Sequence, residues 1–495
     1  MKPYLRILSF IITLATAVSA FAACDSTEET TTDHPVETVL SENVSAEAPT
    51  ETETEFFPSV AKKNYDTEFF LSIQPDSNYA EYHWVKESEN DALSQAIYSR
   101  QQKIYQHLGV EIIGTKTETS KKYVDPFKTA VKSKSGAVDS VLTHHYHGID
   151  SFITGGFLSD FNSFSQIDLS ADYWNSRIME DVALNGRMYL GKSDFNILCT
   201  HVVLFNKDMM DRYKDVLEES VYETVEGYRW TLDRMIGLAN LVYVDEGSDG
   251  HTIDDTFGII GEQDAAFCGF LLAGDVSMIQ PNEKGEYVLS VYNDLNKNKT
   301  TDIIEKLQEL AKADCSWFWD WGSTEVVDFQ SNKALLALSN TNRLPYYLNY
   351  DISFGVLPYP MYDENQKDVG YRSLQFGGFT CIPSYVRNPE MVGDTLEMLA
   401  FYSEDVNITF YEKLLGKQVA DAPLDTKMLQ LVWDGIGTDF AQTYYSAFID
   451  TQIFHMMPLL THKNATQNVA SFVASKESNL NKLLYKFMTL VSKQQ

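Results

Sequence analysis

The sequence predicts an α/β protein with parallel strands, and three observations support this fold class. The strand candidates "EFFLSI" (68–73) and "VEII" (110–113) flank the helix candidate "NDALSQAIYSRQQKIYQHL". Apolar residues recur at helical spacing in this helix candidate, namely Leu93, Ala96, Ile97, Ile104 and Leu108. Such alternation of strand and helix is typical of parallel sheets covered by helices. The folded body, residues 66–495, is also longer than one hydrophobic core usually spans.

Capping residues mark both ends of the first helix. Asn90 or Asp91 precedes it as an N-cap, and Gly109 follows it where a left-handed glycine ends a helix. Farther along, "AVDSVL" (137–142) predicts a buried strand that ends at "THHYHG".

A second helix is predicted in "RWTLDRMIGLANLV". Thr231 is its N-cap, and Trp230 and Met235 have the spacing of a hydrophobic staple. Its buried stripe is predicted to contain Leu232, Met235, Ile236 and Ala239.

A third helix is predicted in "RNPEMVGDTLEMLAFYSE", with Asn388 as N-cap and Pro389 at the first helical position. Between the second and third helices, "ISFGVLPYP" (352–360) predicts a strand that Pro358 and Pro360 end.

The N-terminus has the pattern of a secretory signal. Lys2 and Arg6 form a basic start, and a short apolar segment follows them. This segment is shorter than the roughly 20 apolar residues that a transmembrane helix needs. The following "FAAC" resembles the lipobox of bacterial lipoproteins, although Phe21 stands where Leu is usual. This resemblance implies that residues 1–23 are a signal peptide and that Cys24 is lipidated. The alternative is an ordinary signal peptide cleaved nearby.

Residues 24–65 are expected to form a disordered acidic tether. Residues 25–55 contain ten Asp or Glu, no Lys or Arg, and few large apolar side chains. Such a segment cannot bury enough apolar surface to offset the entropy lost on ordering.

Charge and motifs exclude several classes of function. The net charge is −31, of which residues 56–495 carry −23, and the absence of Lys and Arg clusters argues against nucleic acid as a partner. No metalloprotease, serine-hydrolase, P-loop, dithiol or dinucleotide motif occurs, so we expect no enzyme and no cofactor. The four body cysteines, Cys199, Cys268, Cys315 and Cys381, match no metal spacing and allow three disulfide pairings or free thiols.

Seven stretches after the tether resemble, in order, the extracellular solute-binding proteins of ABC importers, of the maltose-binding, sugar-type group. They cover roughly residues 66–445, and "WFWDWG" (317–322) is not among them. The stretches are "NDALSQAIYSRQQKIYQHLGVEI", "IDLSADYWN", "NGRMYLGKSDFNILCTHVVLFNKDMM", "YRWTLDRMIGLA", "FQSNKALLALSNTNR", "FGVLPYPMYDENQ" and "IPSYVRNPEMVGDTLEMLAFYSE".

The resemblance implies a two-lobe, periplasmic-binding-protein-like fold with hinge strands and an interlobe cleft. Lobe one is expected to contain residues 66–197 and 323–368, and lobe two residues 198–322 and 369–495. The implied function is capture of a solute and its delivery to the permease subunits of an importer. The protein is expected to be a monomer, held by its lipid anchor on the extracellular face of the cell membrane.

The resemblance also implies a set of ligand-binding residues by position. From lobe one these are His145, Tyr146, Asp194, Asn340 and Arg343, and from lobe two Gln263 and Phe267. No metal ligand is expected among them.

The motif "HHYH" (144–147) has three interpretations: ligand contact, a structural turn, or a metal site. Consecutive residues at the end of a strand point to opposite faces, so His144 and His145 are not expected to share one ion.

The segment "DLNKNKTTDIIE" (294–305) copies much of an EF-hand loop, but Lys299 replaces the glycine of the sharp turn. A polar loop leading into a helix is the alternative to a calcium site.

The aromatic cluster "WFWDWG" is compatible with sugar stacking in the cleft or with a place in the core. The solute is expected to be an oligosaccharide, with peptides and other polar solutes as alternatives. The competing function is a surface lipoprotein enzyme that acts on carbohydrate, similar to a glycosidase. Such an enzyme needs two facing carboxylates.

Overall fold

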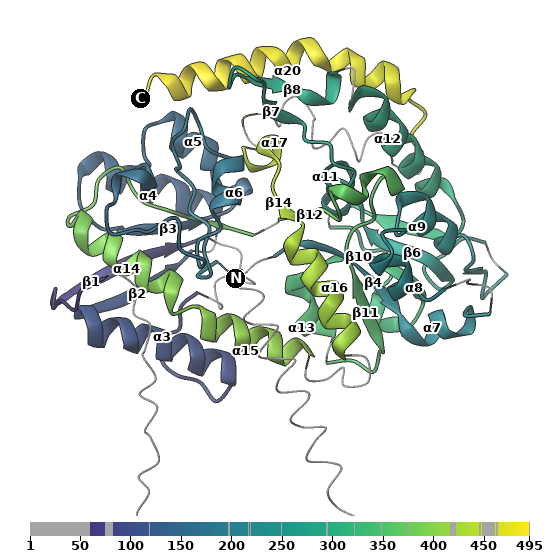
Figure 1. Cartoon of the computed structure of the whole chain (residues 1–495), viewed down its shortest axis with the longest axis horizontal. Helices are drawn as coiled ribbons and strands as arrows, with labels where there is room; N and C mark the ends of the chain where they lie inside the picture. The colour runs from purple at the N-terminus through teal and green to yellow at the C-terminus, as the bar shows by residue number, and fades with distance from the viewer. Residues whose placement is uncertain are drawn as a thin grey trace, which may run out of the picture.

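Two α/β lobes lie side by side in the computed structural model (Figure 1). The structure describes residues 60–74, 83–117, 119–196, 199–215, 217, 219–248, 250–293, 296–320, 322–347, 349–375, 377–415, 422–444, 447, 461 and 464–494. The predicted signal peptide, Cys24 and the tether up to residue 59 lie outside these residues. The fold class predicted from the sequence is confirmed.

Lobe one is built on a four-stranded sheet in the order β13-β3-β1-β2. Its strands are β1 (Thr67–Ile73), β2 (Val110–Lys116), β3 (Ser140–Thr143) and β13 (Phe379–Cys381). Strand β1 pairs in parallel with both β2 and β3, whereas β13 pairs antiparallel with β3. The helices of this lobe are α3 (Ala92–Leu108), α4 (Ser120–Ser133), α5 (Ile149–Thr154), α6 (Ser176–Asp181), α14 (Pro389–Phe401) and α15 (Glu404–Leu415).

The predicted caps are present at the ends of these helices. The Asp91 side chain accepts hydrogen bonds from the backbone N–H groups of Leu93 and Ser94, so Asp91 is the N-cap of α3. Gly109 ends α3 with φ of 62°, in the left-handed region. Its close approach to Asn64 also leaves no room for a Cβ atom. Asn388 caps α14, and Pro389 occupies its first turn.

Lobe two contains a six-stranded sheet in the order β11-β4-β10-β6-β5, with β9 also paired to β6. Its strands are β4 (His201–Asn206), β5 (Tyr243–Val244), β6 (Thr256–Glu262), β9 (Ser316–Trp319), β10 (Ala334–Asn340) and β11 (Phe354–Leu357). A hairpin of β7 (Ile279–Pro281) and β8 (Tyr287–Leu289) lies outside this sheet.

Helices surround the second sheet. They are α7 (Lys207–Arg212), α8 (Val221–Glu226), α9 (Leu232–Ala239), α10 (Gln263–Ala266), α11 (Gly269–Ala273), α12 (Asn296–Lys312), α13 (Leu344–Tyr347) and α16 (Ala422–Asp434). Thr231 caps α9 as predicted, and the buried residues of α9 are Leu232, Met235, Leu238 and Ala239. Leu238 therefore takes the buried place that the sequence pattern gave to Ile236.

The pairing of two late segments differs from the expected division into lobes. Residues 323–368 were expected in lobe one, but β10 lies between β4 and β6, and β11 pairs with β4. Conversely, β13 and α14 fall within 369–495, the range expected in lobe two, but they pack on β3 and α3 of lobe one. The hydrogen-bond ladders therefore place 323–368 in lobe two and the start of the last segment in lobe one.

Two of the segments that link the lobes are neighbours, and their described parts are residues 191–196 and 199–200, and residues 375 and 377–380. The chain passes between the lobes again from α15 to α16. Isolated bridges join Gly191 to Thr380 and Thr200 to Gln375. Thr200 also donates its hydroxyl to the carbonyl of Leu374, at 2.9 Å. Next to them, β12 (Ser373–Leu374) pairs with β14 (Ile436–Gly437), which leads into α17 (Phe440–Thr443) and later into the C-terminal helix α20 (Val469–Ser492).

Folded structure begins earlier than the predicted tether boundary at residue 65. The backbone N–H groups of Lys63 and Tyr65 donate to the carbonyls of His107 and Leu108, and Val60 is buried. The Lys63 ammonium and the Tyr65 hydroxyl both contact the buried carboxylate of Asp394, at 2.6 and 2.7 Å. Residues 60–65 therefore belong to lobe one. The sequence missed this because a lysine and a tyrosine next to an acidic segment carry no folding pattern.

Within the described ranges, no helix has the length and apolar character needed to cross a membrane.

The bond between Tyr65 and Asp394 gives a test of this docking. Tyr65→Phe is expected to lower the free energy of unfolding by about 1.5–3 kcal/mol, because it removes a hydrogen bond to a buried charged group. Urea denaturation of the mature chain measures this change. Tyr105→Phe, at a side chain that is 53% exposed, is the matched control and is expected to have almost no effect. Equal stabilities of the two variants would show that residues 60–65 do not contribute to folding.

Candidate functional site

The carboxyl ends of parallel strands mark the candidate site in each lobe. In lobe one, β1 and β3 run parallel and end near Gln74 and Thr143. In lobe two, β6 runs parallel to β9 and to β10, so Glu262, Trp319 and Asn340 end their strands at one edge. In open α/β sheets, ligands bind outside such carboxyl ends.

At the lobe-one edge, the side-chain amide of Gln74 is buried without a partner. Gln74 is 2% exposed, and neither its oxygen nor its nitrogen forms a hydrogen bond to any described group. A Cβ atom on Gly378 would come within 3.0 Å of the Thr143 carbonyl and 3.2 Å of the Gln74 oxygen. Glycine at 378 thus lets the crossing segment approach this edge. An unsatisfied buried amide costs about 1–3 kcal/mol, which a polar ligand or a water molecule recovers.

Histidines gather where β3 ends. The rings of His144 and His145 lie 3.7 Å apart between centroids, contrary to the expectation that they point to opposite faces. The strand ends at Thr143 and residues 145–147 form a 3₁₀ helix, so the alternation of a strand no longer applies. Burial, and then the charges of His144, His147 and His201, lower the pKa of His145 well below its ordinary value.

His201 belongs to lobe two, where it starts β4 opposite Asn340. Burial lowers its pKa to about 4. The His201 ring packs against Tyr359 of lobe two, with 5.5 Å between ring centroids.

A buried lysine holds the two neighbouring crossing segments together at the boundary between the lobes. Lys192 is fully buried and donates from Nζ to the carbonyl of Gly378, at 3.0 Å. Burial lowers its pKa to about 7. The ammonium lies 5.7 Å from the centre of the Phe379 ring. Lys192 therefore helps to position Gly378 beside Gln74.

At the lobe-two edge, Arg343 and Glu262 approach each other. Their charged groups are 4.0 Å apart, and the Arg343 side chain is 54% exposed. The buried side-chain oxygen of Asn340 has no hydrogen-bond partner among the described residues. This edge therefore combines an accessible cation, a carboxylate, a partly buried indole from Trp319 and an amide.

The other predicted ligand-binding residues lie away from this group. Phe267 is 0% exposed and packs against Phe270 and Phe318, so it is a core residue in this conformation. Gln263 is buried and donates to the hydroxyl of Thr461, at 2.9 Å. The side chain of Tyr146 lies outside the described residues.

Asp194 is buried on the side of α15. Burial, and then the charges of Glu404 and Asp172, raise the pKa of its carboxyl well above the ordinary value. Its backbone carbonyl accepts a hydrogen bond from Asn407 at 3.1 Å.

Of the predicted set, His145 lies just after β3 in lobe one, and Asn340 and Arg343 lie at and just after the end of β10 in lobe two. Gln74 follows β1, Trp319 ends β9, and Lys192 lies in a crossing segment. The sequence already pointed to Trp319 as a candidate for sugar stacking, because it belongs to the aromatic cluster "WFWDWG". Gln74 belongs to no motif, and Lys192 lies within the stretch "NGRMYLGKSDFNILCTHVVLFNKDMM" without being distinguished there as a site residue.

The two metal hypotheses find no structural support. Among the described residues, no group of three or more His, Cys, Asp or Glu side chains is placed to hold a metal ion. Most of the EF-hand-like segment is helical, since α12 already begins at Asn296 and a calcium loop cannot form there. The four body cysteines are buried, and none forms a disulfide bond within the described residues.

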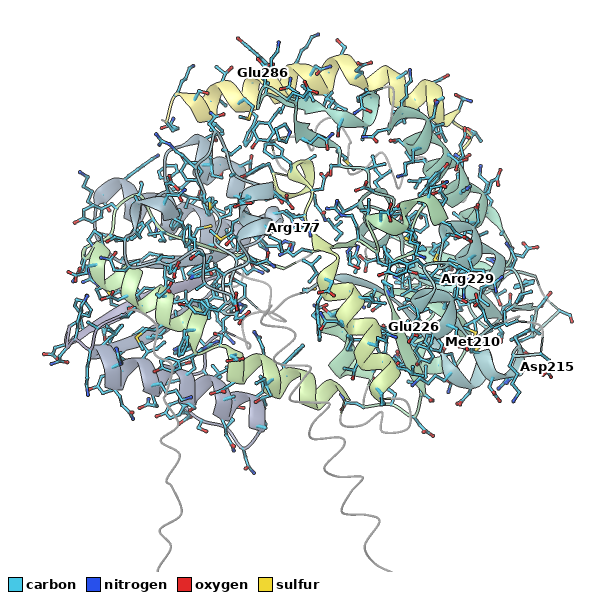
Figure 2. The ribbon with its side chains drawn as sticks, in the orientation of Figure 1. Arg177, Met210, Asp215, Glu226, Arg229 and Glu286 are labelled. Atoms are coloured by element: carbon cyan, nitrogen blue, oxygen red, sulfur yellow. The ribbon has the colours of Figure 1, made fainter. Side chains whose placement is uncertain are left out.

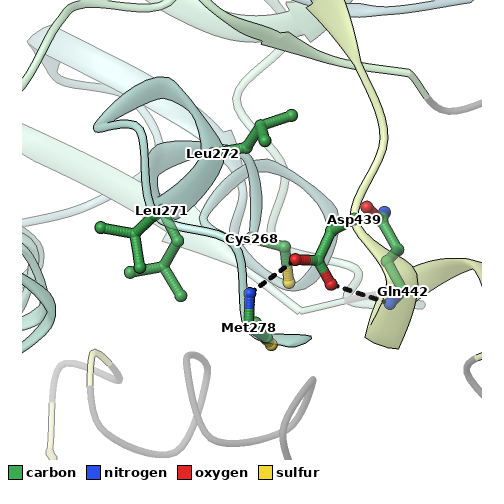
Figure 3. Close-up of a pocket in the computed structure, with 7 residues that line it drawn as sticks. Cys268, Leu271, Leu272, Met278, Asp439 and Gln442 are labelled. Carbon is green, nitrogen blue, oxygen red and sulfur yellow. Dashed lines mark hydrogen bonds between the residues drawn. The ribbon is translucent and has the colours of Figure 1, made fainter. Parts of the chain in front are cut away.

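A small cavity between α11 and α17 is unsuited to a solute. Its lining is mostly apolar and includes Cys268, Leu271, Leu272 and Met278 (Figure 3). The Asp439 carboxylate at its edge is already occupied, because it accepts hydrogen bonds from the backbone N–H groups of Met278 at 2.7 Å and Gln442 at 3.1 Å. We therefore assign this cavity to packing and place the candidate site at the lobe boundary.

The two sheets, the crossing segments and the facing strand ends define the two-lobe α/β fold of sugar-type ABC solute-binding proteins. Two of the similar solved structures are an ABC substrate-binding protein and a maltose/maltodextrin-binding domain. No family model and no curated protein sequence matches the chain.

Three solved structures illustrate the similarity. An ABC substrate-binding protein from Listeria monocytogenes in complex with cycloalternan is 12% identical, with a TM-score of 0.54, and the match covers 85% of this chain and 99% of that one. The maltose/maltodextrin-binding domain from Bdellovibrio bacteriovorus bound to maltotriose is 15% identical, with a TM-score of 0.53 and coverage of 84% and 100%. UgpB from Mycobacterium tuberculosis in complex with glycerophosphocholine is 13% identical, with a TM-score of 0.57 and coverage of 85% and 98%.

Asp439 gives a pH-dependent test of the packing beside the cavity. Burial raises its pKa from 3.8 to about 6, so the folded protein binds the extra proton between these pH values. The free energy of unfolding should therefore fall as pH rises through this window. Asn at position 439 can still cap the helix but does not titrate. Asp439→Asn is therefore expected to make the decrease in the free energy of unfolding between pH 4 and pH 7 smaller by about 2–3 kcal/mol. Urea denaturation at pH 4 and pH 7 measures the difference.

Asp91→Asn, at the N-cap of α3, is the control for this substitution. The interpretation is wrong if Asp439→Asn has the same dependence of stability on pH as the unmodified protein.

Proposed function

We propose that this chain is the solute-binding component of an ABC importer, and that it binds an oligosaccharide between its two lobes. The bound solute passes to the permease subunits of the importer. One observation carries the proposal: at the carboxyl ends of parallel strands in each lobe, the buried side-chain amide of Gln74 and the buried side-chain oxygen of Asn340 have no hydrogen-bond partner among the described residues.

A neutral, hydroxyl-rich solute suits these groups. Amides and imidazoles both donate and accept hydrogen bonds, as sugar hydroxyls do. The indole of Trp319 and the guanidinium of Arg343 offer flat faces for a sugar ring at the same edge. Two of the similar structures above hold oligosaccharides, cycloalternan and maltotriose, which supports the choice of ligand class.

We assign His145, Tyr146 and Gln74 to the lobe-one half of the site, and Trp319, Asn340 and Arg343 to the lobe-two half. Closure follows because a ligand that contacts both halves stabilises the state in which both sets of contacts exist. Asp194, Gln263 and Phe267 support the surrounding elements and do not contact the solute in this conformation.

An enzyme acting on carbohydrate is disfavoured by the surroundings of the nearby carboxyl groups. Glu262 lies beside Arg343, whereas Asp194 is buried near Glu404 and Asp172. The two groups thus have separate environments, and neither faces the other as a catalytic pair requires.

Binding of a saccharide should raise the thermal unfolding temperature of the mature chain. A ligand at one hundred times its dissociation constant stabilises the folded state by about 2.7 kcal/mol. The probes are maltotriose and cycloalternan, with glycerophosphocholine and a tripeptide as the competing classes. Stabilisation by a competing class alone, with no response to any saccharide, would contradict the proposed ligand.

Trp319→Leu is expected to weaken binding of the stabilising saccharide roughly tenfold, through loss of ring stacking. Trp317→Leu is the matched control: it lies two residues earlier on β9, stacks on His251 and donates to the carbonyl of Glu325. Isothermal titration should show weaker binding for the Trp319 variant only.

The anchor is proposed from the sequence alone. With acyl chains on Cys24, the protein is held on the extracellular face of the membrane, since two or more chains give stable attachment. Cys24→Ala is expected to release the protein into the medium with unchanged thermal stability. Equal retention of this variant in the membrane fraction would show that another element attaches the chain.

A further inference from the structure

The C-terminal helix α20 is a further connection between the lobes, in addition to the crossing segments and the contacts of α15 with α13 and α16. Figure 1 shows it along the top of the molecule, from α12 past the β7–β8 hairpin toward α5. It contacts α12 and β8 of lobe two and α5 of lobe one. With 24 residues it is roughly 36 Å long, enough to span both lobes.

One face of α20 is buried along its whole length. The buried residues are Val469, Val473, Leu480, Leu484, Phe487 and Val491. Toward the C-terminal end of α20, the Phe487 ring packs against Phe440 and Tyr444, at centroid distances of 6.2 and 5.1 Å. The opposite face is open to solvent, as Tyr485 at 76% exposure shows.

Three side chains from the C-terminal region and lobe two donate to lobe one. The hydroxyl of Tyr444 donates to the carbonyl of Val182, and that of Tyr287 donates to the carbonyl of Ala183. Gln494, just beyond α20, donates from Nε2 to the carbonyl of Thr154 at 3.1 Å.

These acceptors share a position in the fold. Thr154 is the last residue of α5, and Val182 and Ala183 immediately follow α6. The last carbonyls of a helix have no partner within the helix, so each of these bonds satisfies a group that otherwise needs water. Two helices of lobe one are thus capped by side chains that come from outside it.

The apolar packing at this boundary is continuous. One hydrophobic cluster contains Phe127 and Phe152 of lobe one, Phe440 and Phe487 of the C-terminal region, and Ile259 of lobe two. Burial also raises the pKa of Tyr287 and Tyr444, so both phenols remain protonated donors at physiological pH. Arg177 of α6 lies between the lobes in the same region (Figure 2).

We propose that α20, Tyr287 and Tyr444 form an interlobe clasp, which holds the C-terminal ends of α5 and α6 against lobe two and limits how far the lobes separate. The clasp acts independently of the crossing segments, because its contacts come from residues 287, 444 and 469–494. Its effect on solute affinity rests on the proposed function, whereas its effect on lobe separation does not.

The test compares two kinds of Tyr→Phe substitution. The clasp variant is Tyr287→Phe with Tyr444→Phe. The control is Tyr371→Phe, which removes a hydroxyl that donates at 2.9 Å to Val225 near the end of α8, within lobe two. Each substitution removes a bond from a tyrosine to a carbonyl at the end of a helix, but only the clasp variant affects both lobes.

Lobe separation is measured without ligand by electron–electron resonance between spin labels. The labels are attached at Tyr105→Cys in lobe one and Leu424→Cys in lobe two, both exposed, on a Cys24→Ala background in which the native cysteines are buried. The clasp variant is expected to shift the distance distribution to larger values and to broaden it about twofold, with no change in the Tyr371 control. Identical distributions in the clasp variant and the control would overturn the proposal.

If the double variant fails to fold, Gln494→Ala tests the same proposal. The hydrogen bond from Gln494 to Thr154 is exposed, so its loss leaves the hydrophobic core intact. This variant should produce a smaller shift in the same direction, and no shift would again overturn the clasp. Where a saccharide ligand is known, the clasp variant should also bind it several-fold more weakly, since the open state is more populated. A shift in distance without any saccharide binding would support the clasp and contradict the proposed function.

Discussion

The architecture depends on how two extended segments cross the boundary between the lobes. A crossing chain leaves the sheets, so its backbone N–H and C=O groups lose their regular partners and must find others. Here the two crossings satisfy each other, through bridges between Gly191 and Thr380 and between Thr200 and Gln375. Lys192 adds a side-chain bond to the carbonyl of Gly378. This pairing brings the two sheets together at the carboxyl ends of their parallel strands, where the candidate site lies.

Local features of the fold were predictable from the sequence, because capping chemistry acts within a few residues. Asp91, Gly109, Thr231 and Asn388 each occupy the predicted cap. Lobe membership was not predictable in the same way. Whether β10 pairs with β4 or with β1 depends on contacts between residues far apart in the chain, and the hydrophobic pattern of "ALLAL" is the same in either sheet.

The site was only partly accessible to sequence reasoning for a related physical reason. His145, Asn340 and Arg343 were expected from their positions in the family resemblance, and they lie at or just after the ends of β3 and β10. Gln263 and Phe267 also come after a strand, but they begin and cap the short helix α10, and both side chains are buried. Gln74 could not be recognised as a site residue from the sequence, because the residues that surround it, Gly378 and Thr143, are distant from it in the chain.

The docking of residues 60–65 has a practical consequence for immobilising the protein. Their backbone bonds go to the end of α3, beside the start of β1, so the chain enters lobe one at the amino edge of its first sheet. The candidate site lies at the other end of the same strands, seven residues along β1. A biosensor surface coupled to the chain close to residue 60 is therefore expected to attach on the side away from the candidate site. Such a coupling leaves the binding edge accessible to analytes in the flow.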